Sequence, residues 1–451
     1  MNATEPLGAD IRELIRTGPI GAFQFTALAV CVGLNMLDGF DVLVMSFAAS
    51  GVSAEWGLSG RQLGLLLSAG LVGMALGALF LAPWADRVGR RNIIVVSVWL
   101  VSLGMVASGF ARTYLQLGVL RVLTGVGIGG ILASATVLIA EYASERWRNT
   151  ASCLYTAGYS LGATAGGAVA AVLIAHYGWR AAFQFGALLS TAMLPFVYWG
   201  LPESVDFLIT RRPPDALPRL NALLQRMRHA ALYALPASCA GPVLPTATPA
   251  RRLFDASVAR ATLCVWIEFF FMMGGYYFIF GWTPRLLSAS GLTAQQGITG
   301  GVLLSLGGIF GTVLFAFIAR VVPIRRLTCA ALLATGVLMP LFALTSAHLA
   351  WALACGVVLG GVANGAMAGS YALTPPLYPP EVRTTGMGWA IGIGRLGAIL
   401  APIGAGMLVD AGWPPLDLYL LFGVLYVVSM LALASIAPRA GAAPARAGYR
   451  A

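Results

Sequence analysis

The sequence predicts an all-α membrane protein with twelve transmembrane helices arranged in two homologous six-helix halves. Composition is the first observation, because 59% of the 451 residues are hydrophobic and only 10% are charged. A soluble protein of this length needs far more charge to cover its surface. The second observation is a recurrence of apolar stretches, and the third is an internal repeat.

Apolar stretches recur roughly every 30–35 residues, each near the ~20 residues that a membrane-spanning helix requires. We place them at 22–50, 62–83, 92–111, 113–140, 150–174, 179–200, 259–287, 295–319, 326–346, 348–373, 384–409 and 416–437. One long polar stretch rich in proline and arginine separates the sixth from the seventh. The predicted division is therefore an N-terminal half (1–200), a cytoplasmic central loop (201–258) and a C-terminal half with a cytoplasmic tail (259–451).

The two halves share sequence. GLSGRQ at 57–62 returns 234 residues later as GLTAQQ at 291–296, and VLTGVGIGG at 122–130 is similar to VLGGVANGA at 358–366. Two homologous six-helix halves related by an axis along the membrane normal place a substrate site at their interface, near the middle of the membrane. This is the architecture of a transporter.

Arginine placement orients the chain, which contains no lysine. Under a topology with both termini in the cytoplasm, the outer loops hold only Arg61, Arg112, Arg180 and Arg285. All other loop arginines then face the cytoplasm, as the positive-inside rule requires. The same topology accounts for the formal charge of +11. We expect no nucleic-acid partner, because no basic stripe is interleaved with stacking aromatics.

Several activities are excluded by missing residue patterns. The six cysteines lack CxxC or metal-ligand spacing, so we expect no metal site and no cofactor. His176 and His348 fall at outer loops and His229 lies in the central loop, and we find no nucleophile elbow and no nucleotide-binding motif. The chain is therefore not predicted to be an enzyme or an ATP-driven pump. A membrane sensor without transport activity is the rival class, and a ligand-induced transport current would distinguish the two.

The first apolar stretch carries two acids, in NMLDGFDVLVMS at 35–46. Asp38 and Asp41 are three residues apart and Asn35 lies three before Asp38, so all three share one helical face. Two ionised carboxylates in hydrocarbon are costly, and like charges this close disfavour ionisation of both. We expect one of them to carry a proton during transport. A structural carboxylate is the alternative for each, and the choice between them stays open.

Two further charges are predicted inside the membrane. Arg121 lies more than one turn inside the fourth stretch, so it should face the bundle interior. Glu268, near the start of the seventh stretch, is the third intramembrane acid and a further proton-coupling candidate. Tyr276 and Tyr277 follow it beside glycines and could form a wall for an aromatic ring, although core aromatics are an equal alternative.

Arg395 is a lone arginine among glycines in WAIGIGRLGAILAP at 389–402. A buried guanidinium requires an anion, and its fork matches a carboxylate in bidentate geometry. A substrate carboxylate is our preferred partner for Arg395, and a static pair with an intramembrane acid is the alternative. Asn35, Tyr276, Tyr277 and Arg395 are thus the predicted substrate-binding residues.

Taken together, these motifs resemble the aromatic acid:proton symporters, a branch of the major facilitator superfamily. The resemblance spans nearly the whole chain outside the central loop. It is carried by DGFD (38–41), ADRVGRR (85–91), RVLTGVGIGG (121–130), GWR…LPES (178–204), WTPRLL (282–287) and YPPEVRTTGMGWAIGIGRLG (378–397). DGFD and GIGR are specific to the branch, whereas ADRVGRR marks the superfamily alone.

The resemblance implies roles for individual residues. Asp38 and Asp41 would be required for transport, Arg121 would take part in proton coupling, and Arg395 would handle substrate. Asp86, Arg90 and Arg91 would form a cytoplasmic conformational latch, with Asp86 pairing with Arg90 or a neighbouring helix end. Glu141 is a further gating candidate; the alternative is a solvated helix-end charge paired with Arg146 or Arg148.

The function implied is proton-coupled import of an aromatic carboxylate such as benzoate, hydroxybenzoate or protocatechuate, by alternating access in the bacterial inner membrane. Its partners would be the substrate, protons and lipid, with the protein working as a monomer. Export, or symport of another small organic anion or metabolite, is the alternative. Many proton-driven exporters of the superfamily have a Gly-Pro kink in the fifth helix, and the fifth stretch here has no proline.

Overall fold

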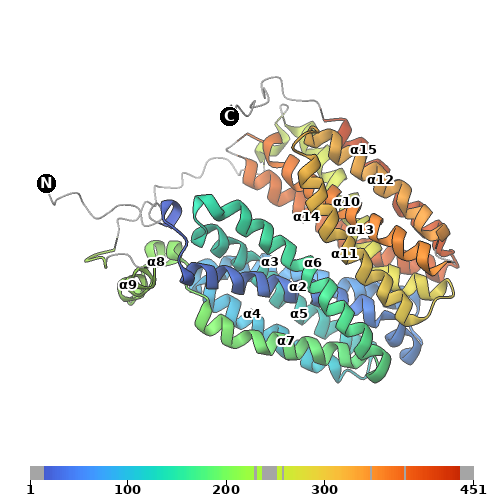
Figure 1. Cartoon of the computed structure of the whole chain (residues 1–451), viewed down its shortest axis with the longest axis horizontal. Coiled ribbons are helices and arrows are strands. Elements are labelled where there is room, and N and C mark those ends of the chain that lie inside the picture. The colour runs from blue at the N-terminus through green and yellow to red at the C-terminus, as the bar shows by residue number, and fades with distance from the viewer. Residues whose placement is uncertain are drawn as a thin grey trace.

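The computed structural model describes residues 15–227, 231–235, 251–255, 258–345, 348–379 and 382–436. Within these ranges, twelve helices have at least 18 residues and are apolar enough to cross a membrane. Six belong to each half, and the two halves lie side by side as separate helix bundles (Figure 1). The prediction of an all-α membrane protein with two six-helix halves is confirmed.

The membrane-crossing helices are long, as a tilted span requires. Those of the N-terminal half are α2 (Ala22–Trp56), α3 (Gly60–Val88), α4 (Arg90–Gly109), α5 (Tyr114–Tyr142), α6 (Glu145–Tyr177) and α7 (Trp179–Gly200). Those of the C-terminal half are α10 (Ala259–Ala289), α11 (Ala294–Ile318), α12 (Ile324–Thr345), α13 (Leu349–Leu373), α14 (Arg383–Asp410) and α15 (Pro415–Ala434).

The first two helices extend beyond their predicted ends. α2 continues six residues past residue 50 and stops where Gly57 adopts a left-handed conformation with φ 60°. α3 continues through Pro83 to Val88, whereas the prediction ended at residue 83. In both cases the helix continues beyond the apolar stretch that the sequence predicted.

The repeated sequences GLSGRQ and GLTAQQ begin equivalent helices in the two halves. Ser59 Oγ accepts a hydrogen bond from Gln62 N–H while Gln62 Oε1 accepts from Ser59 N–H, at 3.3 and 3.0 Å. Thr293 and Gln296 form the same reciprocal pair at 3.2 and 2.9 Å. Each pair satisfies backbone donors that a helix start leaves free. The internal repeat is therefore a repeated start signal for α3 and α11.

Short helices connect the halves where the structure describes the central loop. They are α8 (Val205–Arg211), α9 (Ala216–Arg226) and the 3-10 helix η1 (Arg251–Phe254). Ser204 caps α8 by accepting a hydrogen bond from Phe207 N–H at 3.1 Å. This places α8 directly beyond the end of α7, at the end of the bundle where α2 begins and α15 ends (Figure 1). We call this the terminal end.

The opposite end of the bundle joins the halves, and we call it the sealed end. Gly60 N–H and Arg61 N–H, at the start of α3, donate to the two carboxylate oxygens of Asp410 at the end of α14, at 2.5 and 2.8 Å. Ser46 donates to the carbonyl oxygen of Phe280 at 2.8 Å, and Ser68 to that of Ile399 at 2.7 Å. Within the described ranges, the hydrogen bonds between the halves all lie in the part of the bundle nearer this end. The halves are thus held together at the sealed end.

We expect Asp410→Ala to weaken the seal, because it removes two charge-assisted hydrogen bonds at the protein surface. A loss of about 1 kcal/mol corresponds to about a fivefold shift towards conformations open at the sealed end. The shift is measured as faster labelling of Ser50→Cys by a membrane-impermeant thiol reagent, in a chain whose six native cysteines are replaced. Asp417→Ala, an exposed acid at the same end, is the matched control and should leave the labelling rate unchanged.

Candidate functional site

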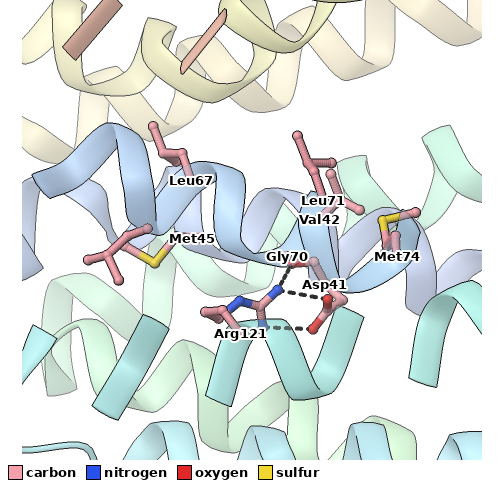
Figure 2. Close-up of a pocket in the computed structure, with 9 residues that line it drawn as sticks. Asp41, Val42, Met45, Leu67, Gly70, Leu71, Met74 and Arg121 are labelled. Atoms are coloured by element: carbon pink, nitrogen blue, oxygen red, sulfur yellow. Dashed lines mark hydrogen bonds and ion pairs between the residues drawn. The ribbon is translucent and has the colours of Figure 1, made fainter. Parts of the chain in front are cut away.

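A buried ion pair connects α2 to α5. Arg121 donates to the two carboxylate oxygens of Asp41 at 2.9 and 2.7 Å, and also to the Asp41 carbonyl oxygen at 2.8 Å (Figure 2). The two side chains are 2% and 3% exposed. Arg121 therefore faces the bundle interior, as predicted, and its partner is one of the two acids of the first helix.

The pair lies at the edge of a small pocket. Figure 2 shows side chains from α2 and α3 around it, and the pocket is lined by Asp41, Val42, Met45, Leu66, Leu67, Gly70, Leu71, Met74 and Arg121. The Arg121 guanidinium also lies 5.8 Å above the ring centre of Phe183. In such apolar surroundings a single charge would be costly, so both charges are compensated within one bidentate contact.

Asp38 has no such compensation. It is 5% exposed, and its Oδ1 atom has no hydrogen-bond partner among the described residues. The two charges that act on it most strongly are the carboxylate of Asp41 and, from the other half, the guanidinium of Arg395. Arg121 already neutralises Asp41. Of the two acids on α2, Asp38 is therefore the one whose charge depends on a further group.

Close contacts at glycines fix the position of α2, and with it Asp38, relative to α6. A Cβ on Gly39 would collide with the backbone carbonyl of Tyr159, and one on Gly162 would collide with that of Met36. The helices therefore touch backbone to backbone, the contact that small residues allow. Asn35 donates to the carbonyl oxygen of Tyr155 at 2.5 Å in the same contact. Asn35 is 4% exposed, so here its amide serves to join α2 to α6.

On the C-terminal half, Arg395 faces the interface from α14. Among the described residues no carboxylate lies within ion-pair distance of it, so the alternative of a static ion pair is not what the structure contains. Gly388 and Gly392 precede Arg395 on the same helical face, and a Cβ on either would meet no atom within 4 Å. The Arg395 side chain is half-buried and has no carboxylate in ion-pair contact among the described residues.

The predicted tyrosines occupy different environments. Tyr276 is 4% exposed and donates to Asn364 Oδ1 at 3.2 Å within its own half. Its ring centre lies 4.5 Å from that of Phe280, so Tyr276 is part of a packed aromatic layer. Tyr277 is less buried, and the charges that act on it are those of Arg395 and Asp38. Tyr277 is therefore the tyrosine of this pair that borders the charged site.

Glu268 lies deep within the C-terminal half. It is 1% exposed, and its Oε1 accepts a hydrogen bond from Ser370 Oγ of α13 at 2.5 Å. Its backbone carbonyl accepts another from Ser429 of α15 at 3.0 Å. The second carboxylate oxygen, Oε2, has no partner among the described residues. Glu268 connects three helices of one half and is set apart from the Asp38–Asp41 pair.

The gating candidates meet at the terminal end of the N-terminal half. Arg90 forms an ion pair with Glu141 and a second, at 3.3 Å, with Asp86. Glu141 also accepts from Ser204 Oγ at 2.9 Å and from Val205 N–H at 3.1 Å. The expected pairing of Asp86 with Arg90 is found. The alternative pairing of Glu141 with Arg146 or Arg148 was wrong, because α8 covers Glu141 and leaves its carboxylate only 10% exposed.

The adjacent Glu203 completes this cluster. Its Oε1 accepts from Arg91 N–H at 3.2 Å and Ser204 N–H at 2.9 Å, while Arg91 donates from its guanidinium to the Tyr198 carbonyl at 2.6 Å. Burial raises the pKa of Glu203, and its hydrogen bonds with the backbone oppose that rise. Glu203 and Ser204 belong to LPES, which the sequence marked only through family resemblance.

The internal repeat aligns APWADRVGRRN (82–92), which contains Asp86, with AFIARVVPIRR (316–326), a second cytoplasmic copy that is built differently. Arg320 occupies the place of Asp86, and its guanidinium lies 5.0 Å from the ring centre of Phe317. Arg325 donates to backbone carbonyls at the end of α15, among them Ala434 O at 2.9 Å. Backbone contacts thus replace the acid–arginine pair of the first copy.

Three tyrosines near the charged site were missed from the sequence. Tyr155 and Tyr159 of α6 both experience the charge of Asp38. Tyr371 of α13 experiences the charges of Arg395 and Glu268. The first two lie one turn apart, beside the glycine stripe at Gly158 and Gly162 that faces α2. That stripe was the available signal, because it marks the face of α6 that contacts the acidic helix.

Comparison with known proteins identifies this architecture. Residues 30–360 match the family profile described as Major Facilitator Superfamily. The chain belongs to the major facilitator superfamily. It is 35% identical over 429 residues to the gallate transporter of Pseudomonas putida, which covers 95% of this chain and 94% of that protein. It is 31% identical over 420 residues to the 4-hydroxybenzoate transporter PcaK of Pseudomonas aeruginosa, with 90% of each covered.

These relatives confirm the predicted branch of aromatic acid transporters within the major facilitator superfamily. The chain is a multi-pass transporter of the bacterial inner membrane and not an enzyme. Its fold is similar to the inward-open conformation of the xylose transporter XylE from E. coli, with a TM-score of 0.72 at 18% identity. That similarity covers 92% of this chain and 96% of the other.

Removing one member of the Asp41–Arg121 pair should destabilise this facilitator strongly, because the remaining charge is buried without a partner. We expect Asp41→Asn and Arg121→Gln each to lower stability by about 3–5 kcal/mol. The double variant Asp41→Asn/Arg121→Gln should recover most of that loss. Thermal unfolding of the purified protein tests this, and equal losses in the double and single variants would contradict it.

Proposed function

We propose that the chain is a proton-coupled symporter that imports a small aromatic carboxylate. The observation that carries the proposal is the half-buried Arg395 guanidinium, which forms no ion pair with a carboxylate among the described residues. An arginine in that situation matches a substrate carboxylate in charge and in fork geometry. Tyr277 borders the same site and offers an aromatic face. The relatives named for gallate and 4-hydroxybenzoate support an aromatic acid as substrate.

Asp38 is the proposed proton carrier. Arg395, from the other half, is the positive charge that acts on Asp38 from a distance, whereas Asp41 is neutralised within its own half by Arg121. Binding of the substrate carboxylate to Arg395 would cancel the effect of that positive charge on Asp38 and so favour its protonation. The site would then hold no excess charge when the halves rearrange around it, which lowers the cost of closure. Glu268 is a second proton site in this proposal.

The proposal includes the orientation of the chain in the membrane and its cytoplasmic gate. Both termini and the segment 201–258 lie in the cytoplasm, between an N-terminal half at 1–200 and a C-terminal half at 259–451. Asp86, Arg90, Arg91 and Glu141 act as the cytoplasmic gate, supported by their shared cluster at the terminal end. The protein acts as a monomer. With this orientation the sealed end faces outward, so the structure corresponds to an inward-facing state.

Arg395→Gln should weaken binding of 4-hydroxybenzoate by about 10- to 100-fold, because a charge-assisted bidentate contact is lost. Arg395→Lys should retain part of the affinity. Binding to the purified protein and uptake into proteoliposomes with an inward pH gradient are both measured. The control ligand is 4-hydroxybenzamide, whose weak binding should not change between wild type and variant. Uptake by the wild type that ignores the pH gradient would contradict proton coupling.

Asp38→Asn should separate transport from proton coupling. The amide is close to the neutral carboxylic acid in shape, so the variant should exchange labelled substrate across the membrane. It should not accumulate substrate against a gradient, and the expected loss of accumulation is more than tenfold. Counterflow and gradient-driven uptake are compared in the same proteoliposomes, with Asp417→Asn as the control. Normal accumulation by Asp38→Asn would remove Asp38 from the mechanism.

A further inference from the structure

Two helices of the C-terminal half carry a proline where they meet the N-terminal half at the sealed end. Pro284 lies inside α10 and Pro402 lies inside α14. Proline has no backbone N–H, so each one deprives the carbonyl four residues earlier of its helical donor and makes the helix easier to bend there. The 234-residue offset of the internal repeat places Ser50 of α2 where α10 has Pro284, and α2 contains no proline. The weak point in α10 therefore has no counterpart in α2.

The N-terminal half supplies a donor at the weak point of α10. The Ser46 hydroxyl of α2 donates to the carbonyl oxygens of Phe280 and Gly281, which lie 2.8 Å away. Phe280 is four residues before Pro284, so its carbonyl is the one that the proline leaves without a helical donor. A serine hydroxyl from a neighbouring helix can satisfy such a carbonyl inside a membrane. Ser46 thus joins the halves and compensates the proline with one hydrogen bond.

A similar contact joins α3 to α14. Ser68, which is 1% exposed, donates to the carbonyl oxygen of Ile399 at 2.7 Å, three residues before Pro402. One turn further towards the sealed end, a Cβ on Gly64 of α3 would collide with the Pro402 carbonyl oxygen. The backbone of α3 therefore lies directly against the weak point of α14.

Trp282 connects these two contacts. Its indole N–H donates to the Pro402 carbonyl oxygen at 3.1 Å, and the residue is 1% exposed. Among the described residues no other hydrogen bond joins α10 to α14. A backbone contact between the two helices, at Gly397 and the Phe270 carbonyl, lies on the terminal side of both prolines. Beyond the prolines, Trp282 is thus the polar link between the ends of α10 and α14.

We propose that Trp282 makes the two contacts of the seal open and close as one unit. The hydrogen bonds form a continuous series from α2 through α10 and α14 to α3. Without Trp282, the ends of α10 and α14 can bend separately at their prolines, and the loss of one serine contact releases one end only. With Trp282 in place, displacement of either end breaks the hydrogen bond to the other. The link prevents a half-open seal and works in the same way whichever substrate the protein carries.

Two reporter cysteines follow the two contacts separately, in a chain whose six native cysteines are replaced. Ser50→Cys reports on α2 against α10, because Ser50 Oγ lies 3.5 Å from Ser288 Oγ. Val409→Cys reports on α14 against α3, because Val409 packs against Gly60. Each reporter is labelled with a water-soluble thiol reagent in the purified full-length protein. The labelling rate measures the fraction of molecules in which that contact is open.

Ser46→Ala should accelerate labelling of both reporters about fivefold, the effect of one lost hydrogen bond. In a Trp282→Phe background it should accelerate labelling at position 50 alone. Ser68→Ala should likewise act on both reporters when Trp282 is present and on position 409 alone in Trp282→Phe. Separate responses in the presence of Trp282 would overturn the inference, as would joint responses in Trp282→Phe. Unchanged labelling in both serine variants would overturn it too.

Trp266→Phe is the matched control. Trp266 lies on the same helix, and its indole nitrogen has no hydrogen-bond partner among the described residues. In this background both reporters should respond together, as they do in the wild type. If Trp282→Phe does not fold, benzothienylalanine at position 282 replaces it, because this residue keeps the shape of tryptophan and exchanges only the N–H group for sulfur.

Discussion

The bidentate contact between Asp41 and Arg121 is the interaction on which the rest of the site depends. Both groups are almost fully buried, and neither could remain charged there without the other. By neutralising Asp41, Arg121 leaves Asp38 as the acid whose state responds to other groups. In the proposed mechanism, two acids three residues apart therefore have separate tasks, and the difference arises from their neighbours on α5 and α14.

A second constraint is the close approach of helices through glycine. Gly39 of α2 contacts α6, and Gly397 of α14 contacts the Phe270 carbonyl of α10 in the same way. These contacts lie within one half each and fix the charged side chains to rigid bodies. Movement between the halves then changes the distance between Asp38 and Arg395 without distorting either helix pair. In the proposed mechanism, this variable distance between fixed groups couples the proton to the substrate.

Much of the fold could be predicted from sequence, because apolar length and the internal repeat report directly on membrane-crossing helices. The burial of Arg121 followed from the cost of a charge in hydrocarbon. Its partner did not, since Asp41 lies 80 residues away in sequence and only the packing of α2 on α5 brings them together. The partner of Glu141 was missed for the same reason, because Arg90 lies 51 residues away in sequence and only the packing of the helix ends brings the two together.

The site was predicted less completely than the fold. Charged residues in a membrane helix are conspicuous, so Asp38, Glu268 and Arg395 were evident. Tyrosines are common in membrane helices for packing reasons, and nothing in their spacing separates a Tyr155 from a Tyr276. The distinction depends on whether a hydroxyl finds a partner, and Asn364 supplies one for Tyr276 alone. Whether a tyrosine hydroxyl finds a hydrogen-bond partner depends on tertiary structure and is not visible in the sequence.

The contact between Asp410 and the start of α3 has a consequence for how this protein tolerates sequence change. The N-terminal half contributes two backbone N–H groups, which any residue except proline can supply, and the Ser59 hydroxyl and the Arg61 charge also act on the Asp410 carboxylate. Gly60 and Gly406 are restricted, because a Cβ on either would collide with the other's carbonyl oxygen. In a genetic screen for altered gating, changes should therefore concentrate at positions 60, 406 and 410.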